Sequence, residues 1–380
     1  MLGPRATRAG TGPGGRTGSD RESSTAAVDA LLAEHLGTRL REARQVDSVF
    51  ADEVASRVAA FVLNGGKRLR TAFVRCGWMA AGGSGDAGTP LRIGAALELL
   101  QACALVHDDV MDESPVRRSA PAVHMDFARM HRAGRMRGSA ASWSANAAVL
   151  AGDLALAWAD DLLTETALNS PYGERLHREW QAMRVEMAAG QYLDVRAQAT
   201  GSSDLAQARH IATLKSALYT VERPLALGAS LAGADARTMD ALRSAGQSVG
   251  LAFQLRDDLL GAFGDPDVTG KPTDEDLRAR KLTYLLAVAL RLATESGDTD
   301  ALAVLGPEGA APGGERVHRM RAALERTGAR AAVEEEIAGL SASGLRHFAS
   351  SGADERARSE FASLVARAVG AVPARSGEDA

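Results

Sequence analysis

The stretch LELLQACALVHDDVMDESPVRR, residues 97–118, decides how this chain folds. Its first ten residues are mostly apolar and contain neither glycine nor proline, which favours a helix. Asp108 and Asp112 are four residues apart and share one helix face, with Asp109 about 100° round the axis. Three such carboxylates repel one another unless solvent, basic groups or cations neutralise them, and hard oxygen ligands suit Mg²⁺ or Mn²⁺. The stretch therefore predicts a metal site at a helix end. The alternative interpretation is an acidic helix end that is simply solvated.

A second acidic pair lies in FQLRDDLLGAFGDPDVTGKP, residues 253–272, where an apolar helix pattern again gives way to a polar loop. Asp257 and Asp258 mirror the first pair. Position 261, which would complete DDxxD, is Gly261, and Asp265 is a poorly placed third acid. Two facing clusters could hold several Mg²⁺ ions, an array that suits a diphosphate group.

Basic residues accompany these acids. GGKRLR, residues 65–70, places Lys67 and Arg70 after a Gly-Gly turn, where backbone and side chains can converge on an anion. Arg117 and Arg118 follow the first cluster, and Lys271 follows the second. Each alone is more often a solvated surface charge, but together they indicate an anionic substrate.

The rest of the chain predicts an all-α protein. Apolar residues recur at steps of three and four, no segment alternates with period two, and aromatic residues make up only 4% of the chain. Loops are expected at 77–90, 131–143, 263–272 and 305–316, which are rich in Gly, Pro, Ser or Asp. We expect one domain at 25–370, with disordered tails at 1–24 and 371–380.

Composition excludes several classes. Forty-four Lys and Arg against 48 Asp and Glu give a net charge of −4, too balanced for a nucleic-acid-binding protein. No apolar stretch is judged long enough to span a membrane, and the N-terminus lacks a secretory signal, so we expect a cytoplasmic protein. Cys76 and Cys103 have apolar neighbours and no metal-ligand spacing, which predicts buried thiols.

The motif set resembles the trans-isoprenyl diphosphate synthases of the polyprenyl synthetase family, geranylgeranyl diphosphate synthases in particular. The matching pieces are GGKRLR, LVHDDVMDESPVRRSAPAVH, LAGDLAL, GQYLD, KSALYT and FQLRDDLLGAFGDPDVTGKP, in family order between about residues 60 and 285. The resemblance implies a single-domain helical prenyl synthase bundle with a central cavity, usually a homodimer.

The resemblance also implies site residues. Ligands of more than one Mg²⁺ ion, with Mn²⁺ as a substitute, would be Asp108, Asp109, Asp112, Asp257 and Asp258. The allylic diphosphate would be held by Arg117, Lys215, Gln254 and Lys271, and isopentenyl diphosphate by Lys67, Arg70, Gln101 and Arg118.

The implied reaction condenses isopentenyl diphosphate with dimethylallyl, geranyl or farnesyl diphosphate to a longer trans-polyprenyl diphosphate. Metal ions and cationic side chains stabilise the leaving diphosphate in a water-poor pocket, the isopentenyl double bond attacks the allylic cation, and a proton is lost. No side-chain nucleophile is required.

Product length depends on the helix before Asp108. Farnesyl-length members of the family carry bulky aromatics where this chain has Cys103 and Ala104, while Leu100 and Leu97 lie further down the helix. A C20 product, geranylgeranyl diphosphate, is expected, with farnesyl or longer-chain synthesis as the alternatives. The chain departs from the family pattern at Gly261, Thr71 and Ser119.

Three other classes are weighed. A class I terpene cyclase would need a different second metal motif, which is missing from the sequence. A di-iron bundle could use Glu174-x-x-His177 and Glu315-x-x-His318, although both pairs read as surface residues. A non-catalytic regulatory subunit would be expected to have lost more site residues than position 261. His107 is read as a packed histidine and not as a ligand.

Overall fold

The computed structural model describes residues 14–85, 87–265, 274–306 and 314–370, and the side chains from residue 25 onward. The described part is all-α, as predicted, apart from strands β1 (Val116–Arg117) and β2 (Ala120–Pro121). These two strands pair antiparallel, with Val116 opposite Pro121. The four expected loop regions contain the breaks between helices wherever the structure describes them.

The helices follow one another closely, and two of them are π-helices, η1 and η2. In chain order the helices are α1 (Gly14–Val46), α2 (Ser48–Phe50), η1 (Ala51–Ala55), α3 (Ser56–Leu63), α4 (Leu69–Ala80), α5 (Gly88–Met111), α6 (Val123–Ala133), α7 (Ala140–Leu168), α8 (Gly173–Thr200), α9 (Leu205–Ala212), η2 (Thr213–Glu222), α10 (Arg223–Leu231), α11 (Ala236–Phe263), α13 (Glu275–Ala279), α14 (Tyr284–Ser296), α15 (Thr299–Leu305), α16 (Gly314–Arg326), α17 (Ala329–Ala349) and α18 (Glu355–Val369).

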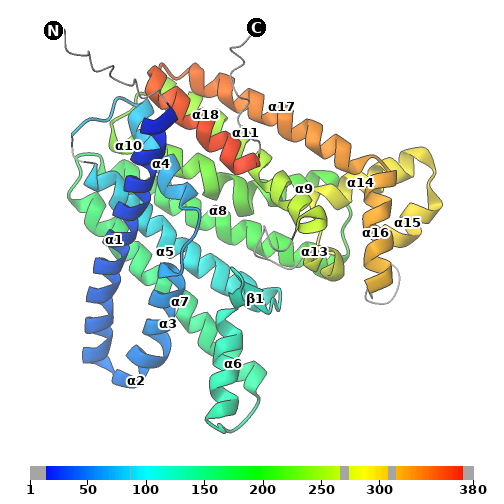
Figure 1. The fold of residues 1–380 in the computed structure, drawn as a ribbon, viewed down its shortest axis with the longest axis horizontal. Coiled ribbons are helices and arrows are strands. Elements are labelled where there is room, and N and C mark those ends of the chain that lie inside the picture. The colour runs from blue at the N-terminus through cyan, green and yellow to red at the C-terminus, as the bar shows by residue number, and fades with distance from the viewer. Residues whose placement is uncertain (1–13, 86, 266–273, 307–313, 371–380) are drawn as a thin grey trace, which may run out of the picture.

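Helix α5 lies inside the bundle and carries the first acidic motif at its C-terminal end. It packs against α7, α4 and α1 (Figure 1). Leu97, Leu99 and Leu100 are fully buried in a core that also contains Trp180 of α8. Burial of this apolar surface fixes the helix, and so fixes where its terminal carboxylates stand.

Helix α11 plays the same part for the second motif. It packs against α17 and η2, and its buried side chains Leu251, Leu255 and Leu259 belong to a second core with α14 to α17. Helices α14, α15 and α16 extend from the main bundle at one end (Figure 1). The two acidic motifs are thus presented by two separately anchored helices.

The N-terminal helix is longer than expected. Helix α1 begins at Gly14, whereas residues 1–24 were predicted as a disordered tail. A helix packed from Val28 onward can extend into a segment without apolar side chains, because propagation adds one hydrogen bond per residue. At the other end, α18 finishes at Val369, and Gly370 follows it in the left-handed region.

Among the described residues, one helix has the length and hydropathy of a membrane span, contrary to the sequence-based expectation. This helix is α5, and 67% of its apolar window is buried inside the bundle. A helix in the core of a large bundle is apolar on all sides, which explains the high hydropathy of α5.

Candidate active site

The first acidic motif occupies the last turn of α5. Asp112 caps this helix, and its N–H donates to the carbonyl of Asp108 at 2.8 Å. The helical spacing therefore holds to the end, and the side chains of Asp108 and Asp112 project to the same side, as predicted.

Asp108 is surrounded by donors from three elements. Its Oδ1 accepts from Lys215 Nζ at 2.9 Å and from Gln191 Nε2 at 3.1 Å, and its Oδ2 lies 3.4 Å from Arg117 Nη2. Burial alone would raise the pKa of Asp108, but Lys215, Lys281 and Arg117 outweigh burial and hold this pKa below its ordinary value. Asp108 is therefore a carboxylate.

Lys281 joins Asp112 to a third carboxylate. Its Nζ lies 2.7 Å from Asp112 Oδ2 and 3.3 Å from Oδ2 of Asp194, which is only 2% exposed. Lys215 Nζ contacts the same Asp194 oxygen at 2.6 Å. Burial would lower the pKa of Lys281, but Asp194, Asp108 and Asp112 raise it well above its ordinary value. Two ammonium groups thus draw three carboxylates together.

The close approach of Lys215 to α8 depends on a glycine. A Cβ atom at Gly190 would lie 2.4 Å from the backbone nitrogen of Lys215, so no larger residue fits there. Lys215 itself is in η2, and π-helical turns are frequent at functional sites. The glycine of the GQYLD segment is what brings Lys215 within reach of Asp108.

Asp109 has a different environment from its neighbours. It is fully buried, and its Oδ1 accepts from Arg117 Nε at 2.8 Å and also from Arg117 Nη2. Burial would lower the pKa of Arg117, but Asp109 and Asp108 raise it. Asp109 fixes the position of Arg117, while Asp108 and Asp112 face the two lysines.

In the second motif, the two aspartates have opposite surroundings. Asp257 is exposed, whereas Asp258 is 7% exposed. Asp258 accepts from Gln254 Nε2 at 2.8 Å and from the N–H of Tyr284 at 3.1 Å. Burial raises the pKa of Asp258 to about 8, and Asp276 and Asp257 add to this effect. Lys271, the last predicted residue of this region, lies outside the described residues.

A separate group of basic side chains lies around Arg118. Arg118 Nη1 donates to the carbonyl of Phe61 at 3.1 Å, and its guanidinium lies over the Phe61 ring. Burial lowers the pKa of Arg118, and Arg68, Arg117 and Arg70 lower it further, since they crowd positive charge around it. An anion bound here would relieve that crowding.

The basic residues of the GGKRLR segment have different surroundings. Arg68 is buried and pairs with Glu98 Oε2 at 2.9 Å and with Asp29. Lys67 is exposed, and Arg70 Nη2 donates to Thr220 Oγ1 at 2.9 Å. Gly65 and Gly66 have φ values of +81° and +152°, which favour glycine, as expected of a Gly-Gly turn.

Gln101 and Arg70 meet at one tyrosine. The Tyr219 hydroxyl donates to Gln101 Oε1, and the Arg70 guanidinium lies 4.1 Å from the centre of the Tyr219 ring. The structure therefore brings Arg70 and Gln101 together, as predicted from the resemblance. Ser119 has a φ of +58°, in the left-handed region that glycine adopts most easily, which explains why glycine is common there in the family.

The donor set fits divalent cations. Asp108, Asp112 and Asp194 supply hard oxygen atoms from two rigid helices, which is the ligand chemistry of Mg²⁺. Within the described residues, no three acidic, histidine or cysteine side chains converge on a single point. Each carboxylate instead faces a lysine or arginine, so cation binding requires these ammonium groups to turn to another anion, such as a diphosphate.

Gln191, Asp194 and Lys281 are site residues that the sequence alone did not predict. GQYLD was noted as a motif, but no role was given to its members. Lys281 follows α13 as one of three basic residues in RARK, residues 278–281, and nothing in this local pattern distinguishes it from its neighbours. Only the packing of α8 and η2 against α5 brings these residues to Asp108.

The residues proposed to set product length lie below Asp108 on α5. Ala104 is partly exposed, Cys103 is 3% exposed, and Leu100 and Leu97 are fully buried. Cys103 Sγ lies 3.7 Å from His107 Nδ1, and burial raises the pKa of this thiol to about 12. His107 Nε2 lies 3.1 Å from the carbonyl oxygen of Val149, so this histidine is packed and hydrogen-bonded as expected.

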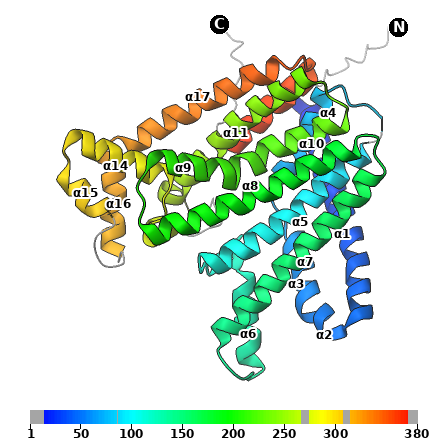
Figure 2. The same ribbon diagram turned by 180° about the vertical axis from the view of Figure 1, so that it is seen from behind.

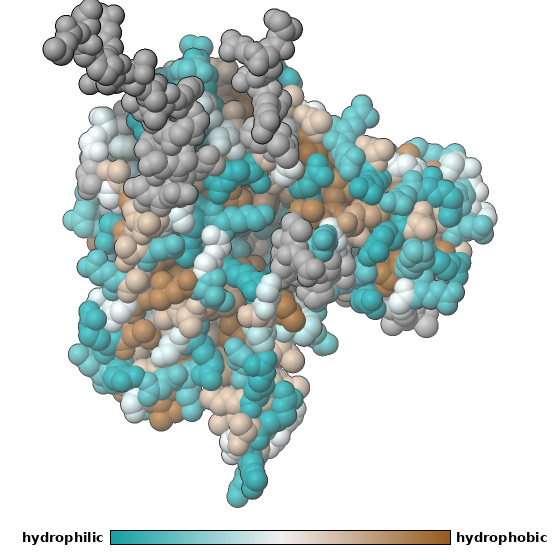
Figure 3. Space-filling model, viewed as in Figure 1, coloured by the Kyte–Doolittle hydropathy of each residue, from teal (hydrophilic) through white to brown (hydrophobic). Residues whose placement is uncertain are grey.

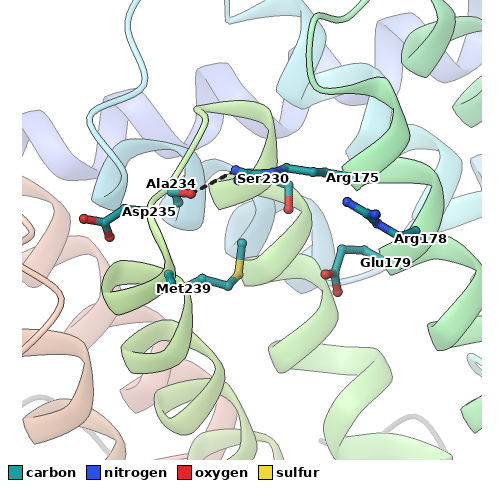
Figure 4. A pocket seen from close by; sticks show the side chains of 8 residues that line it. Arg175, Arg178, Glu179, Ser230, Ala234, Asp235 and Met239 are labelled. Carbon is teal, nitrogen blue, oxygen red and sulfur yellow. Dashed lines mark hydrogen bonds between the residues drawn. The ribbon is translucent and has the colours of Figure 1, made fainter.

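A pocket of about 220 Å³ lies elsewhere, between α8 and the turn from α10 to α11 (Figure 4). Arg175 donates there to the carbonyl of Ala234 at 3.0 Å. Thirteen residues separate Arg178 from Gln191 on α8, about 20 Å along a helix. This pocket is therefore distinct from the acidic site. It is lined by Arg175, Arg178, Glu179, Ser230, Ala234, Asp235, Ala236 and Met239.

The two ExxH pairs do not form a di-iron site. Glu174, His177, Glu315 and His318 are all exposed, and Glu174 pairs with Arg178 on the same helix. The expectation that they are surface residues is confirmed.

Comparison with known proteins identifies the family. The family model "Polyprenyl synthetase" matches residues 52–315. The geranylfarnesyl diphosphate synthase of Aeropyrum pernix is 29% identical over 69% of this chain and 77% of its own length. A geranylgeranyl diphosphate synthase of Mycobacterium tuberculosis is 35% identical over 61% of this chain, but the match spans only 60% of that relative.

A solved structure agrees with these sequence matches. Geranylgeranyl pyrophosphate synthase from Corynebacterium glutamicum, complexed with isoprenyl diphosphate and magnesium, superposes with a TM-score of 0.84 at 35% identity. The match covers 91% of this chain and 99% of that one. The resemblance inferred from the motifs is confirmed: the chain belongs to the polyprenyl synthetase family.

Proposed function

We propose that this enzyme is a prenyltransferase that condenses isopentenyl diphosphate with an allylic diphosphate to give a longer trans-polyprenyl diphosphate. The observation that carries the proposal is the convergence of Asp108, Asp112 and Asp194 on Lys215 and Lys281, beside the basic group around Arg118. One anionic headgroup fits each of these two regions.

Asp108 and Asp112 are the proposed ligands of Mg²⁺ in the first motif, and Asp257 in the second. Magnesium supplies charge neutralisation of the allylic diphosphate as it leaves. The relative from Corynebacterium glutamicum carries isoprenyl diphosphate and magnesium in its crystal structure. Asp109 is reassigned from ligand to positioning residue, because both of its close contacts at Oδ1 are to Arg117. Asp258 is reassigned likewise, since its two oxygens accept from Gln254 and Tyr284.

The protein's own groups perform the remaining work. Lys215 and Lys281 turn from the carboxylates to the allylic diphosphate, with Arg117, Gln254 and Lys271 as further donors. Arg118, Arg70, Lys67 and Gln101 hold isopentenyl diphosphate so that its double bond faces the allylic carbon. Apolar side chains of α5 exclude water from the allylic cation, and the proton leaves to the released diphosphate.

We propose geranylgeranyl diphosphate as the product. The relatives carry names for C15, C20 and C25 products, so their names do not decide the length. Cys103 and Ala104 support a C20 product, because their side chains are smaller than the aromatic residues that would close the path of the growing chain beneath Asp108. Leu100 and Leu97 are the proposed floor one and two turns further down α5.

We propose a homodimer joined through α7 and α8. These helices lie side by side on the face turned to the viewer in Figure 2. Their exposed apolar side chains include Leu150 at 59%, Val185 at 69% and Tyr192 at 66%, which a second copy of the chain would cover. The opposite face, shown in Figure 3, mixes hydrophilic and hydrophobic residues.

We propose a cytoplasmic location, and the state of the two cysteines supports it. Cys76 and Cys103 are both buried and unpaired with each other, which fits a reducing compartment.

Release of inorganic diphosphate tests the reaction. Product should form only when Mg²⁺ and both substrates are present, and chelation with EDTA should stop it. Asp112→Ala should also stop product formation. This variant removes a proposed metal ligand at the cap of α5, outside the core, so the fold should be retained. Diphosphate release from the allylic substrate alone would indicate a cyclase and overturn the proposal.

A further inference from the structure

A basic surface lies where α6 ends and α7 begins. Residues 127–152 contain four arginines and no aspartate or glutamate, although the whole chain has a net charge of −4. Three of these arginines are exposed in residues 132–137, which we call the basic tip, and Met136 stands among them at 36% exposed. The three are Arg132, Arg135 and Arg137. The tip is therefore positive on a chain that is negative overall.

The basic tip projects from the bundle and is fixed from within. Helix α6 and the tip extend beyond the neighbouring helices (Figure 1), and hydrophilic residues cover the end of this projection (Figure 3). The buried His131 has its Nε2 3.2 Å from the carbonyl oxygen of Arg137, and the N–H of Met136 donates to the His131 carbonyl at 3.1 Å. The His131 ring lies 5.6 Å from the Trp143 ring, centre to centre. A partner would thus meet charges that are already in place, at little cost in ordering.

A second projection exposes apolar side chains at the same end of the molecule. The turn between α1 and α2 lies with the basic tip at the lower end of the bundle in both views (Figures 1 and 2). Val46 in this turn is 83% exposed, and Val49 is 60% exposed. Helix α3 ties the two projections together, because the Arg57 guanidinium lies 5.1 Å from the centre of the Phe127 ring of α6. The same end of the bundle therefore offers both positive charge and exposed apolar side chains.

Several acidic residues near this end already have partners in their own part of the chain. Asp47 accepts the hydrogen bond that caps α2, and Asp52 pairs with Arg44. Asp126 pairs with Arg129, one turn of α6 before the tip. The three arginines of the tip therefore remain the main charge that a partner would meet.

We propose that the basic tip, together with Val46 and Val49, docks the enzyme reversibly on a membrane surface that contains anionic lipids. Anionic headgroups attract arginine side chains near the surface, and exposed apolar side chains enter the boundary between headgroups and acyl chains. Two projections at one end of a bundle can rest on a plane together. A C20 diphosphate product would itself partition into such a surface, a point that rests on the proposed function. Three arginines and a few apolar side chains give weak binding to the surface, without insertion.

The test is co-sedimentation of the full-length protein with phosphatidylcholine vesicles, with and without phosphatidylglycerol. Wild type should bind only the vesicles that contain phosphatidylglycerol, and salt should weaken this binding. The triple variant Arg132→Gln, Arg135→Gln, Arg137→Gln should bind these vesicles about tenfold more weakly or worse. The double variant Val46→Ser, Val49→Ser should weaken binding by a smaller factor.

A matched control removes the same charge from the opposite end of the bundle. Arg346, Arg356 and Arg358 are exposed on α17 and α18, at the upper end in Figure 1. The triple variant Arg346→Gln, Arg356→Gln, Arg358→Gln has the same net charge as the tip variant, and it should bind vesicles as wild type does. Both triple variants change exposed side chains only, so their melting temperatures should match that of wild type.

Failure of wild type to bind vesicles with phosphatidylglycerol, equal binding to neutral vesicles, or equal losses in the two triple variants would each overturn the inference. Binding of a DNA duplex as tightly as vesicles, lost in the tip variant, would indicate a general polyanion site and also overturn it. Turnover of dissolved substrates without vesicles should be the same in the tip variant and wild type. If wild type elongates no allylic diphosphate, the proposed function fails, while vesicle binding still decides the docking.

Discussion

The Nζ atom of Lys281 lies 2.7 Å from Oδ2 of Asp112, although the two residues are 169 positions apart in the sequence. Lys281 also contacts the buried Asp194, so it acts as counter-ion to two carboxylates at once. A divalent cation bound to the same carboxylates would likewise neutralise their negative charge. The contact therefore links the stability of the protein to metal binding.

Lys281→Met should lower the free energy of unfolding in metal-free buffer by about 3 kcal/mol, since Asp112 loses its ammonium partner and the buried Asp194 keeps one ammonium group, Lys215, in place of two. Saturating Mg²⁺ with inorganic diphosphate should reduce this loss, because the metal replaces the missing charge. Urea unfolding with and without the ligands measures both values, and Arg291→Met, on an exposed ion pair, is the control. An equal loss in both buffers would contradict the linkage.

Asp108→Asn and Asp109→Asn are the same chemical change at adjacent positions with opposite expected effects. Asp108→Asn should abolish turnover with a smaller loss of stability than Asp109→Asn, because Asp108 is a proposed metal ligand and its partners Lys215 and Arg117 keep Asp194 and Asp109 as counter-ions. Asp109→Asn should destabilise the protein by about 3 kcal/mol, because it removes the buried carboxylate that pairs with Arg117. Kinetics and thermal unfolding of both variants decide the matter. Similar activity in the two variants would contradict the assignment of Asp108 as a metal ligand and Asp109 as a positioning residue.

Ala104→Phe should shorten the product, because a benzyl side chain one turn below Asp108 blocks the path of the growing chain. Cys103→Phe should act in the same direction, with a cost in stability of about 1–3 kcal/mol because Cys103 is 3% exposed. Ala104→Val provides an intermediate volume. Chromatography of the dephosphorylated products gives the length, and an unchanged distribution in all three would show that the chain runs elsewhere.

Gly152→Ala should destabilise the contact between α5 and α7. A Cβ atom there would lie 2.1 Å from Nε2 of His107, which must move and lose its contact with the Val149 carbonyl. The expected cost is about 1–3 kcal/mol. The double variant Gly152→Ala, His107→Ala should recover most of it, because the clash disappears. If the double variant instead loses as much unfolding free energy as the two single variants together, the direct contact is contradicted.

The sequence predicted those parts of the site that depend on local geometry. The spacing of Asp108 and Asp112 placed both on one helix face, and the offset of Asp109 agrees with its turning away to Arg117. The Gly-Gly turn before Lys67 was also recognisable, because positive φ values have a clear sequence signature.

The parts that depend on tertiary packing were not predictable from local pattern. Asp194 lies on α8 and Lys281 follows α13, and neither is close in sequence to a residue that it contacts in the site. Arg68 stood among the basic residues of GGKRLR, yet its partner Glu98 is 30 positions away.

The proposed reaction is tested most directly by the product that the purified enzyme makes from isopentenyl diphosphate with Mg²⁺ and each of dimethylallyl, geranyl and farnesyl diphosphate. We expect a linear C20 alcohol after dephosphorylation from all three primers, and none from Asp112→Ala. Failure to elongate any primer, or release of a cyclic hydrocarbon from the allylic substrate alone, would contradict the central claim that this site joins two diphosphates by prenyl transfer.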